Sequence, residues 1–419
     1  MEHRARLKSR EWEAKHARAG VAWTSVVLLL LIFGSVQFVQ GQTFSLVHVF
    51  TNGRDGESPN SITIDRAGNL YGTSAGGVFR AKPVSGGWIF TPLADLSYFQ
   101  PVSLTIAPSG VLYGTTITGG ANGNGCGTYG CGVVFSVQPP AHANGNILGG
   151  WGANYLYYFT GIPDGATASG GVVVDQAGNL YGTTAGGGAF GRGTVYELSR
   201  TSGGWAETIL YDFSGLQDGM SPWAGVILDQ QGNLYGTTTT GTSNYFWGTV
   251  YKLTHGQSGW TENILYAFQG GDDGGAPVTR LIFDHAGNLY GITGSAGTNL
   301  DGTVFELMPN PNGSWNFNVL YEFSGSRGGF EPPYGALTMD AAGNLYGAWV
   351  NTGAYGAGSV FKLTPANGGW TYTSLHDFTG GVDGAYPVSG VVMDANGNLY
   401  GGTLEGGADG AGVLFEITP

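Results

Sequence analysis

One five-residue segment, Gly-Asn-Leu-Tyr-Gly, occurs six times along the chain, and a degenerate copy at residues 110–114 makes a seventh. The tyrosines of the seven copies are Tyr71, Tyr113, Tyr181, Tyr235, Tyr290, Tyr346 and Tyr400. Most neighbouring copies lie about 55 residues apart, and a short first gap is compensated by a long second one. A repeat of this length indicates one supersecondary unit per copy, with each unit packed against its neighbours.

Each unit reads as four β-strands. The first is a short apolar run ending in Asp, as at residues 172–175, followed by a D-x-x-G-N turn in which Asp suits the first position and Gly-Asn tolerates positive φ. The second is the Leu-Tyr-Gly-Thr-Thr run, and the third follows a Gly-rich loop, as at residues 193–198. A polar turn ending in Trp precedes the fourth strand, as at residues 209–213. Because one Trp recurs per unit, we expect a packing role for Trp88, Trp151, Trp205, Trp260, Trp315 and Trp370.

Seven units of four strands predict an all-β fold, a seven-bladed β-propeller. The chain contains 78 glycines, which disfavour helices, while 42% hydrophobic and 13% aromatic residues favour a packed core over a disordered chain. A strand of the fourth type opens the repeat region at residues 45–50, and one of the third type ends it at residues 412–417. We therefore expect the N-terminal strand to complete the last blade, which closes the ring and leaves no open edge.

The repeat closely resembles the GloVer tandem-repeat family, which is named for a Gly-Leu/Thr-Val-Phe segment. That segment stands here as Gly-Thr-Val-Phe at 302–305, Gly-Ser-Val-Phe at 358–361 and Gly-Val-Leu-Phe at 412–415. The likeness covers nearly all of residues 43–419. It implies a bacterial, exported protein whose surface attachment varies between members, and it implies no particular activity.

The N-terminal region has the layout of an export signal. Residues 1–20 form a basic segment with six Lys and Arg, and residues 21–41 form a signal peptide or a transmembrane anchor ahead of the propeller at 43–419. We favour cleavage before Gln42, and an uncleaved anchor is the alternative because about 19 apolar residues nearly span a bilayer. Either outcome predicts an extracytoplasmic propeller that is secreted, periplasmic or membrane-anchored by residues 21–40, with no other membrane contact.

Charge and cysteine content narrow the partners. Beyond residue 41 the chain carries 10 Lys and Arg against 26 Asp and Glu, a net charge of −16, which opposes binding to nucleic acid or anionic lipid but permits cations and neutral glycans.

Cys126 and Cys131 lie in one Gly-rich loop. In an oxidising compartment we expect a disulfide between them rather than a metal site, for which further ligands are lacking. We expect a monomer without a cofactor, with calcium as the alternative.

In five of the seven units, an Asp-Gly pair lies between a fourth strand and the next first strand. Its aspartates are Asp55, Asp164, Asp218, Asp273 and Asp383. On a propeller they would ring the mouth of the central channel, where they could attract a cation. We favour a structural role in which each Asp caps its own turn, because a binding site usually breaks the symmetry of a repeat.

The loops between second and third strands vary from blade to blade, which favours them as sites of function. The candidate ligand-binding residues there are Phe190, Arg192, Tyr245, Trp247, Asp301, Tyr355 and Glu405. Aromatic rings beside polar groups suit sugars, and the alternative is that these rings cover blade edges.

No catalytic motif stands out. A Gly-x-Ser-x-Gly match at residues 72–76 lies within the repeat with no helix after it, so we assign no catalytic residue. We predict a non-catalytic binding module for a glycan, a surface protein or another envelope component. The alternatives are a lyase or hydrolase acting on a polysaccharide or lactone, which propellers support by analogy of fold alone, and a structural scaffold in adhesion or assembly.

Overall fold

The computed structural model describes residues 42–120, 123, 126, 128–143, 146–148, 150–241, 247–324 and 335–418. Thr43–Thr418 form one compact unit. Among the described residues, no helix is long and apolar enough to cross a membrane. The predicted signal or anchor at residues 21–41 lies outside the described part of the chain.

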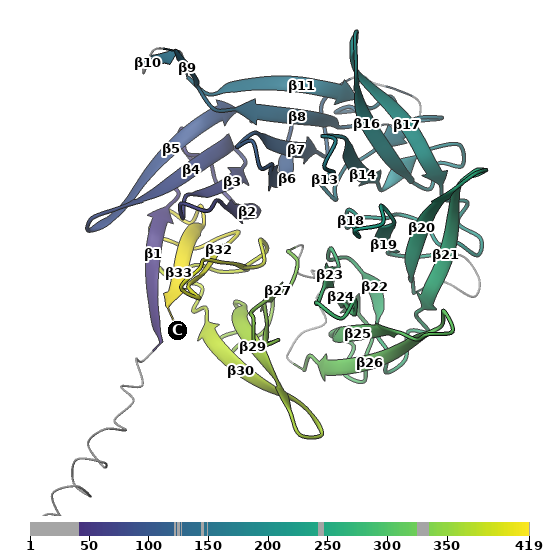
Figure 1. Cartoon of the computed structure of the whole chain (residues 1–419). Coiled ribbons are helices and arrows are strands. Elements are labelled where there is room, and N and C mark those ends of the chain that lie inside the picture. Colours follow the sequence, from purple (N-terminus) through teal and green to yellow (C-terminus); the bar gives the residue numbers. More distant parts are fainter. Residues whose placement is uncertain are drawn as a thin grey trace, which may run out of the picture. The chain divides into compact units, whose positions relative to one another are not determined.

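Within the described residues, seven antiparallel four-stranded sheets form the blades of a β-propeller, as predicted (Figure 1). Blade 1 contains β2 (Ser61–Ile64), β3 (Leu70–Ser74), β4 (Gly77–Val84) and β5 (Gly87–Asp95). Blade 2 contains β6 (Pro101–Ile106), β7 (Leu112–Thr116), β8 (Val133–Gln138) and β11 (Gly152–Tyr158). Blade 3 contains β13 (Val172–Val174), β14 (Leu180–Thr184), β16 (Thr194–Thr201) and β17 (Gly204–Asp212). Blade 4 contains β18 (Ile227–Leu228), β19 (Leu234–Thr238), β20 (Thr249–Gly256) and β21 (Gly259–Ala267).

The remaining blades follow the same order. Blade 5 contains β23 (Ile282–Phe283), β24 (Leu289–Ser295), β25 (Thr303–Pro309) and β26 (Trp315–Glu322). Blade 6 contains β27 (Thr338–Met339), β28 (Leu345–Trp349), β29 (Ser359–Ala366) and β30 (Gly369–Asp377). Blade 7 contains β31 (Val392–Met393), β32 (Leu399–Gly402), β33 (Val413–Thr418) and β1 (Thr43–Val49). Short strands supplement the blades: β9 (Ala141–Ala143) pairs with β10 (Asn146–Leu148), β12 (Gly165–Ala166) with β15 (Gly186–Gly187), and β22 (Gly275–Pro277) with β24.

The ring closes through the first strand of the chain. β1 pairs antiparallel with β33, from Thr43 opposite Thr418 to Val49 opposite Val413. The two strands lie side by side in Figure 1, so the last blade takes its outer strand from the N-terminal end. The predicted closure is confirmed, and this blade has no open outer edge on β33.

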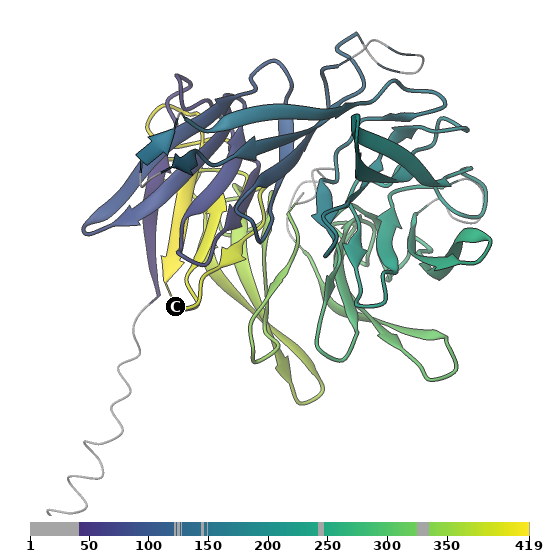
Figure 2. The same cartoon turned by 45° about the horizontal axis from the view of Figure 1, so that its top comes forward.

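The third and fourth strands are longer than the sequence indicated. In blade 3, β16 and β17 continue to the pair Thr201–Gly204, so the hairpin turn is tight and Trp205 lies within the fourth strand, opposite Arg200. The expectation that each Trp ends the turn was therefore wrong. These hairpins, such as β4–β5 and β29–β30, project outward from the ring (Figures 1 and 2). The expected packing role of the Trp holds, since Trp205 contacts the Tyr113 ring of the preceding blade.

The turn after each first strand explains why the repeat contains Asp, Asn and Tyr. In blade 5, the Asp284 carboxylate accepts hydrogen bonds from the Asn288 backbone N–H (2.9 Å), the Asn288 side-chain amide (2.8 Å) and the Tyr290 hydroxyl (3.2 Å). The same three-residue network forms around Asp65, Asp175, Asp229, Asp340 and Asp394. Blade 2 lacks it, because Ala107 and Val111 replace Asp and Asn.

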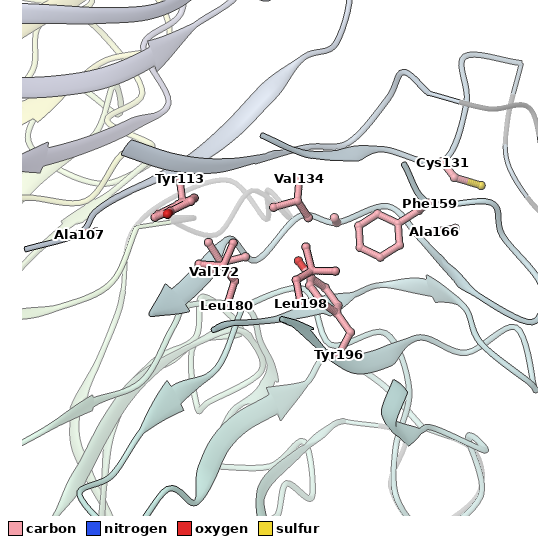
Figure 3. Packing of buried hydrophobic residues seen from close by; sticks show 11 residues of the cluster. Ala107, Tyr113, Cys131, Val134, Phe159, Ala166, Val172, Leu180, Tyr196 and Leu198 are labelled. Atoms are coloured by element: carbon pink, nitrogen blue, oxygen red, sulfur yellow. The ribbon is translucent and has the colours of Figure 1, made fainter. Parts of the chain in front are cut away.

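Buried aromatic rings fill the spaces between blades. Phe159, which follows the last strand of blade 2, is fully buried and meets the Tyr196 ring of blade 3 edge-on at 5.0 Å (Figure 3). Val134, Leu180 and Leu198 surround this pair (Figure 3). The equivalent rings Phe50, Phe213, Phe268, Phe323 and Phe378 are buried in the same way. The core is therefore a ring of inter-blade clusters around the central axis.

Candidate ligand-binding site

The first strands of the blades surround a central cavity of ≈ 680 Å³. Every blade contributes to its wall, as the lining residues Ile62, Leu104, Ser169, Ala224, Ile282, Leu337 and Val391 illustrate. The first strands thus line the central channel. This position lets all seven blades contact a single molecule.

Polar side chains of the cavity wall already hold neighbouring blades together. Thr105 donates a hydrogen bond to the Val172 carbonyl (2.8 Å), and Ser169 donates one to the Trp223 carbonyl (2.9 Å). Asn60 donates its side-chain N–H to the Pro101 carbonyl (3.2 Å). Hydroxyl and amide groups in this wall therefore stabilise the ring, and the rest of the described wall is mostly aliphatic.

Arg280 is the one charged side chain among the described residues that line the cavity. It lies between β22 and β23, where Val278, Arg280 and Ile282 face the cavity and alternate with the buried Thr279 and Leu281. The structure gives it no hydrogen bond or ion pair with any described residue, and desolvation by burial lowers its pKa. A guanidinium thus faces a mostly apolar cavity, and the described residues provide no counter-charge for it.

The sequence contained a signal for Arg280 that our reasoning missed. Arg280 immediately precedes Leu281, the buried aliphatic residue at the start of the first strand. The other six blades place Ser61, Ser103, Gly171, Gly225, Ala336 and Gly390 there. A charged residue at a position of small residues breaks the symmetry of the repeat. The binding residues predicted from the sequence all lie in the outer loops, so Arg280 was not among them.

The five Asp-Gly aspartates make local hydrogen bonds. Asp218 accepts from the Tyr211 hydroxyl (3.2 Å), the Ser214 backbone N–H (2.7 Å) and the Ser214 hydroxyl (2.7 Å). Asp55, Asp164, Asp273 and Asp383 bind the same two positions of the preceding strand and loop. None of the five lines the cavity, and the described residues contain no group of three or more metal-ligating side chains.

Two of these aspartates pair with histidine. Asp55 lies 3.1 Å from Nε2 of His48, and Asp383 lies at the same distance from His376. Burial acts to raise the pKa of Asp55, but hydrogen bonds from Thr51 and His48 hold that pKa below its ordinary value. Burial lowers the pKa of both histidines against the pull of their carboxylate partners. The histidines thus serve as neutral hydrogen-bonding partners near neutral pH.

The loop candidates do not share the cavity. Phe190 and Tyr355 are 60% and 66% exposed, whereas Trp247 packs against a buried cluster that includes Phe268. Arg192 directs Nη1 at the Met220 sulfur (3.4 Å). Asp301 is partly buried and Glu405 is exposed. Tyr245 lies outside the described residues, and none of the other six lines the cavity.

The Asp-Gly loops and the loops between second and third strands lie together on one face. Backbone bridges join the Asp-Gly segment to the following second-to-third-strand loop, as at Met220–Thr240 and Ala385–Glu405. Among the residues that the structure describes, eight exposed apolar side chains occur on these loops: Tyr98, Tyr129, Ile162, Phe190, Leu216, Leu300, Tyr355 and Val382. A disulfide joins Cys126 to Cys131 in the loop that carries Tyr129. This face is therefore more apolar than the aromatic count alone indicated.

Two glutamates between blades have strongly altered acidity. Burial, followed by repulsion from Asp164 and Asp212, raises the pKa of Glu207 to about 8. Burial and Asp218 raise the pKa of Glu262 to about 7. Neither residue lines the central cavity. Their shifts belong to the inter-blade contacts of blades 3 and 4.

Comparisons with known proteins agree with this architecture. The sequence profile of the Gloeobacter/Verrucomicrobia repeat matches residues 74–261, 126–331 and 242–419. Similar solved structures include selenomethionine-substituted virginiamycin B lyase from Staphylococcus aureus (TM-score 0.51, 14% identity, covering 90% of this chain and 100% of that one). A streptogramin B lyase has a TM-score of 0.54 at 14% identity, with 90% of this chain and 97% of that chain covered.

An ancestral GH74 enzyme has a TM-score of 0.53 at 12% identity, with 86% of this chain and 48% of that chain covered. No curated protein matches the sequence. At these identities the likeness to solved structures concerns the fold alone.

Proposed function

The chain belongs to the Gloeobacter/Verrucomicrobia repeat family, and we propose that it is an exported binding module that holds a small, largely apolar ligand in its central cavity. The observation that carries the proposal is the cavity itself, which has a volume of ≈ 680 Å³ and a mostly aliphatic wall built by all seven blades. Pockets for small ligands commonly measure about 300–1,000 Å³. The ligand would be a component of the bacterial envelope or of the surrounding medium.

The burial of apolar ligand surface contributes favourable free energy to binding. Removing about 300 Å² of apolar ligand surface from water stabilises a complex by roughly 7 kcal/mol before the costs of association. Hydrogen bonds between neighbouring blades hold the wall of blades 1 to 4 in place, so little ordering is needed there on binding. Since a Kd of 1 μM requires about −8 kcal/mol after those costs, we expect apolar burial alone to give an affinity weaker than micromolar.

The side chains of the described wall support binding rather than chemistry. General acid–base catalysis needs a group such as His, Asp, Glu or Tyr within reach of the substrate. The described lining residues are aliphatic, hydroxyl, amide, Trp and Arg side chains. A lyase or hydrolase would need a proton-transferring group at this wall, which is the feature that separates the enzymatic alternative from our proposal.

The test uses N-phenyl-1-naphthylamine, an uncharged apolar dye whose fluorescence rises in apolar sites. We expect saturable binding to residues 42–419. The substitution Ala336→Trp, at a half-buried wall position, fills part of the cavity and should abolish it. Phe190→Ala with Tyr355→Ala, on the outer loops, should leave dye binding unchanged. Binding that survives Ala336→Trp but is lost in the loop variant would contradict the proposal.

A second candidate ligand is a glycan bound on the loop face. The exposed rings of Phe190 and Tyr355 favour it, because exposed aromatic rings can stack on sugars. A glycan-array screen of residues 42–419, with and without calcium, tests it directly. We expect any glycan signal to fall at least about tenfold in the Phe190→Ala, Tyr355→Ala variant and to persist in Ala336→Trp. A signal that responds only to Ala336→Trp would assign the glycan to the cavity instead.

A further inference from the structure

The position of Arg280 is unusual for a charged residue. Its neighbours Thr279 and Leu281 are each 1% exposed, and Thr279 also accepts a hydrogen bond from the Ile292 backbone N–H (3.1 Å). The backbone is therefore anchored on both sides, and Arg280, in the segment between β22 and β23, lines the cavity. Val278 and Ile282, which face the cavity with it, are aliphatic.

An unpaired guanidinium in such a wall is unfavourable by itself. Arg280 is half-buried, so its charge loses part of its hydration without gaining a described partner, and neutral wall residues do not offset that cost. The fold does not need a charge at this position, since the other blades hold Gly, Ala or Ser there. A residue that opposes folding and lies in a binding cavity is best explained by a ligand that pairs with it.

We propose that Arg280 binds the carboxylate of a small ligand whose apolar body fills the rest of the central cavity. This inference rests on the proposed function, because it assigns the chemistry of the ligand in the same cavity. The guanidinium presents a planar fork of N–H donors that matches a carboxylate in a bidentate pair. Such a pair removes the uncompensated charge while the aliphatic wall buries the apolar body.

The charge balance favours a monoanion. The described wall supplies one cation, so a phosphate with nearly two negative charges would keep one of them uncompensated in an apolar site. Beyond residue 41 the chain has a net charge of −16, and its field opposes the approach of multiply charged anions. A singly charged carboxylate on an apolar body meets both conditions.

The experiment compares two dyes that differ only in charge. N-phenyl-1-naphthylamine is neutral, and 8-anilinonaphthalene-1-sulfonate carries the same ring system with one sulfonate. We expect residues 42–419 to bind the sulfonate dye about tenfold more tightly than the neutral dye, which is the effect of one charge-assisted pair. Arg280→Met should remove this preference, so that the two dyes bind with similar affinities. Arg280→Lys should keep part of it.

Competition then identifies the anion. Decanoate should displace the sulfonate dye from the unaltered protein at lower concentration than 1-decanol does, and the difference should vanish in Arg280→Met. Inorganic phosphate should not compete. Phosphate that competes as well as decanoate would overturn the carboxylate assignment. If Arg280→Met does not fold, as judged by circular dichroism, Arg280→Gln replaces it.

The outcomes separate this inference from the proposed function. If the neutral dye binds in the cavity and the sulfonate dye binds no more tightly, the Arg280 inference fails and the proposed function stands. The inference also fails if Arg280→Met retains the preference for the sulfonate dye. If neither dye binds, or if Ala336→Trp has no effect on either, the proposed function fails with it.

Discussion

The turn after each first strand and the cavity wall just before it lie close together in the sequence, yet they differ in how faithfully they repeat. The Asp–Asn–Tyr network occurs in six blades, with nearly the same hydrogen bonds in each. At the wall, the residue before the buried aliphatic is Gly, Ala, Ser or Arg. The difference indicates that the turn supports the fold of six of the seven blades, whereas the wall position accommodates one charged residue among small ones.

Removal of a repeated inter-blade ring should have the largest effect on stability. Phe268 is fully buried and contacts the Phe305 ring at 5.3 Å and the Phe317 ring at 5.8 Å. Phe268→Ala should destabilise the propeller by about 3–5 kcal/mol, because the lost contacts leave a cavity. Denaturant unfolding measures this loss. Phe190→Ala, on the exposed loop, is the control and should change stability by about 0.5 kcal/mol or less.

Loss of one repeated turn should have the next largest effect. Asp284→Ala leaves the backbone and side-chain N–H groups of Asn288 without their acceptor, while the Tyr290 hydroxyl keeps Glu306 (2.7 Å), so we expect a loss of about 1–3 kcal/mol in the free energy of unfolding. The exposed Asp409 offers a matched control, and Asp409→Ala should be nearly neutral. Equal effects of the two substitutions would contradict the structural role of the repeated turn.

A smaller effect should distinguish blades 3 and 4 from the others. Glu207 and Glu262 occupy a fourth-strand position where Phe44, Phe90, Phe317 and Tyr372 stand in other blades. Burial first, and nearby carboxylates second, raise the pKa of Glu207 to about 8 and that of Glu262 to about 7, from an ordinary value of 4.5. The folded state therefore holds these protons more tightly than the unfolded state.

The contribution of these two groups to the free energy of unfolding should accordingly be fully present below pH 4.5, and it should be lost as the pH rises toward 8. We expect Glu207→Gln with Glu262→Gln to recover about 1–2 kcal/mol at pH 8.5 relative to pH 5, after allowance for partial exposure. The measurement is the difference in unfolding free energy between the variant and the unaltered protein at each pH. A constant difference would show that the two carboxyls do not titrate with folding.

The smallest effect on stability should come from the wall. Arg280→Met removes a charge that has no described partner, so we expect the free energy of unfolding to stay the same or to rise by about 1 kcal/mol. Thermal unfolding without added ligand checks this. A marked destabilisation would mean that Arg280 supports the fold, and the contrast between turn and wall would then be lost.

Much of the architecture was predictable because the same structural unit occurs seven times in the sequence. Blade number, the order of strands and the closure by the first strand followed from the spacing of the Gly-Asn-Leu-Tyr-Gly copies and from the types of strand at the two ends. Hairpin length was less predictable, since Trp205 could not be placed in the strand rather than in the turn without its partner Arg200.

The candidate site was harder to predict for a physical reason. Residues from seven blades, far apart in sequence, form the cavity wall, and each first strand is too short to show which side faces the axis. Arg280 could have been found by alignment of the seven copies, where it stands against small residues. Phe190 and Tyr355 are exposed, and only the folded ring shows that they do not line the cavity.

The central claim is that the non-repeating wall, and not the repeating turn or the loop face, binds the ligand. The most direct measurement is the anomalous diffraction of crystals of residues 42–419 soaked with 11-bromoundecanoate. We expect a bromine peak inside the central cavity, with the carboxylate within hydrogen-bonding distance of the Arg280 guanidinium. Bromine on the loop face around Phe190 and Tyr355, with no density in the cavity, would contradict it.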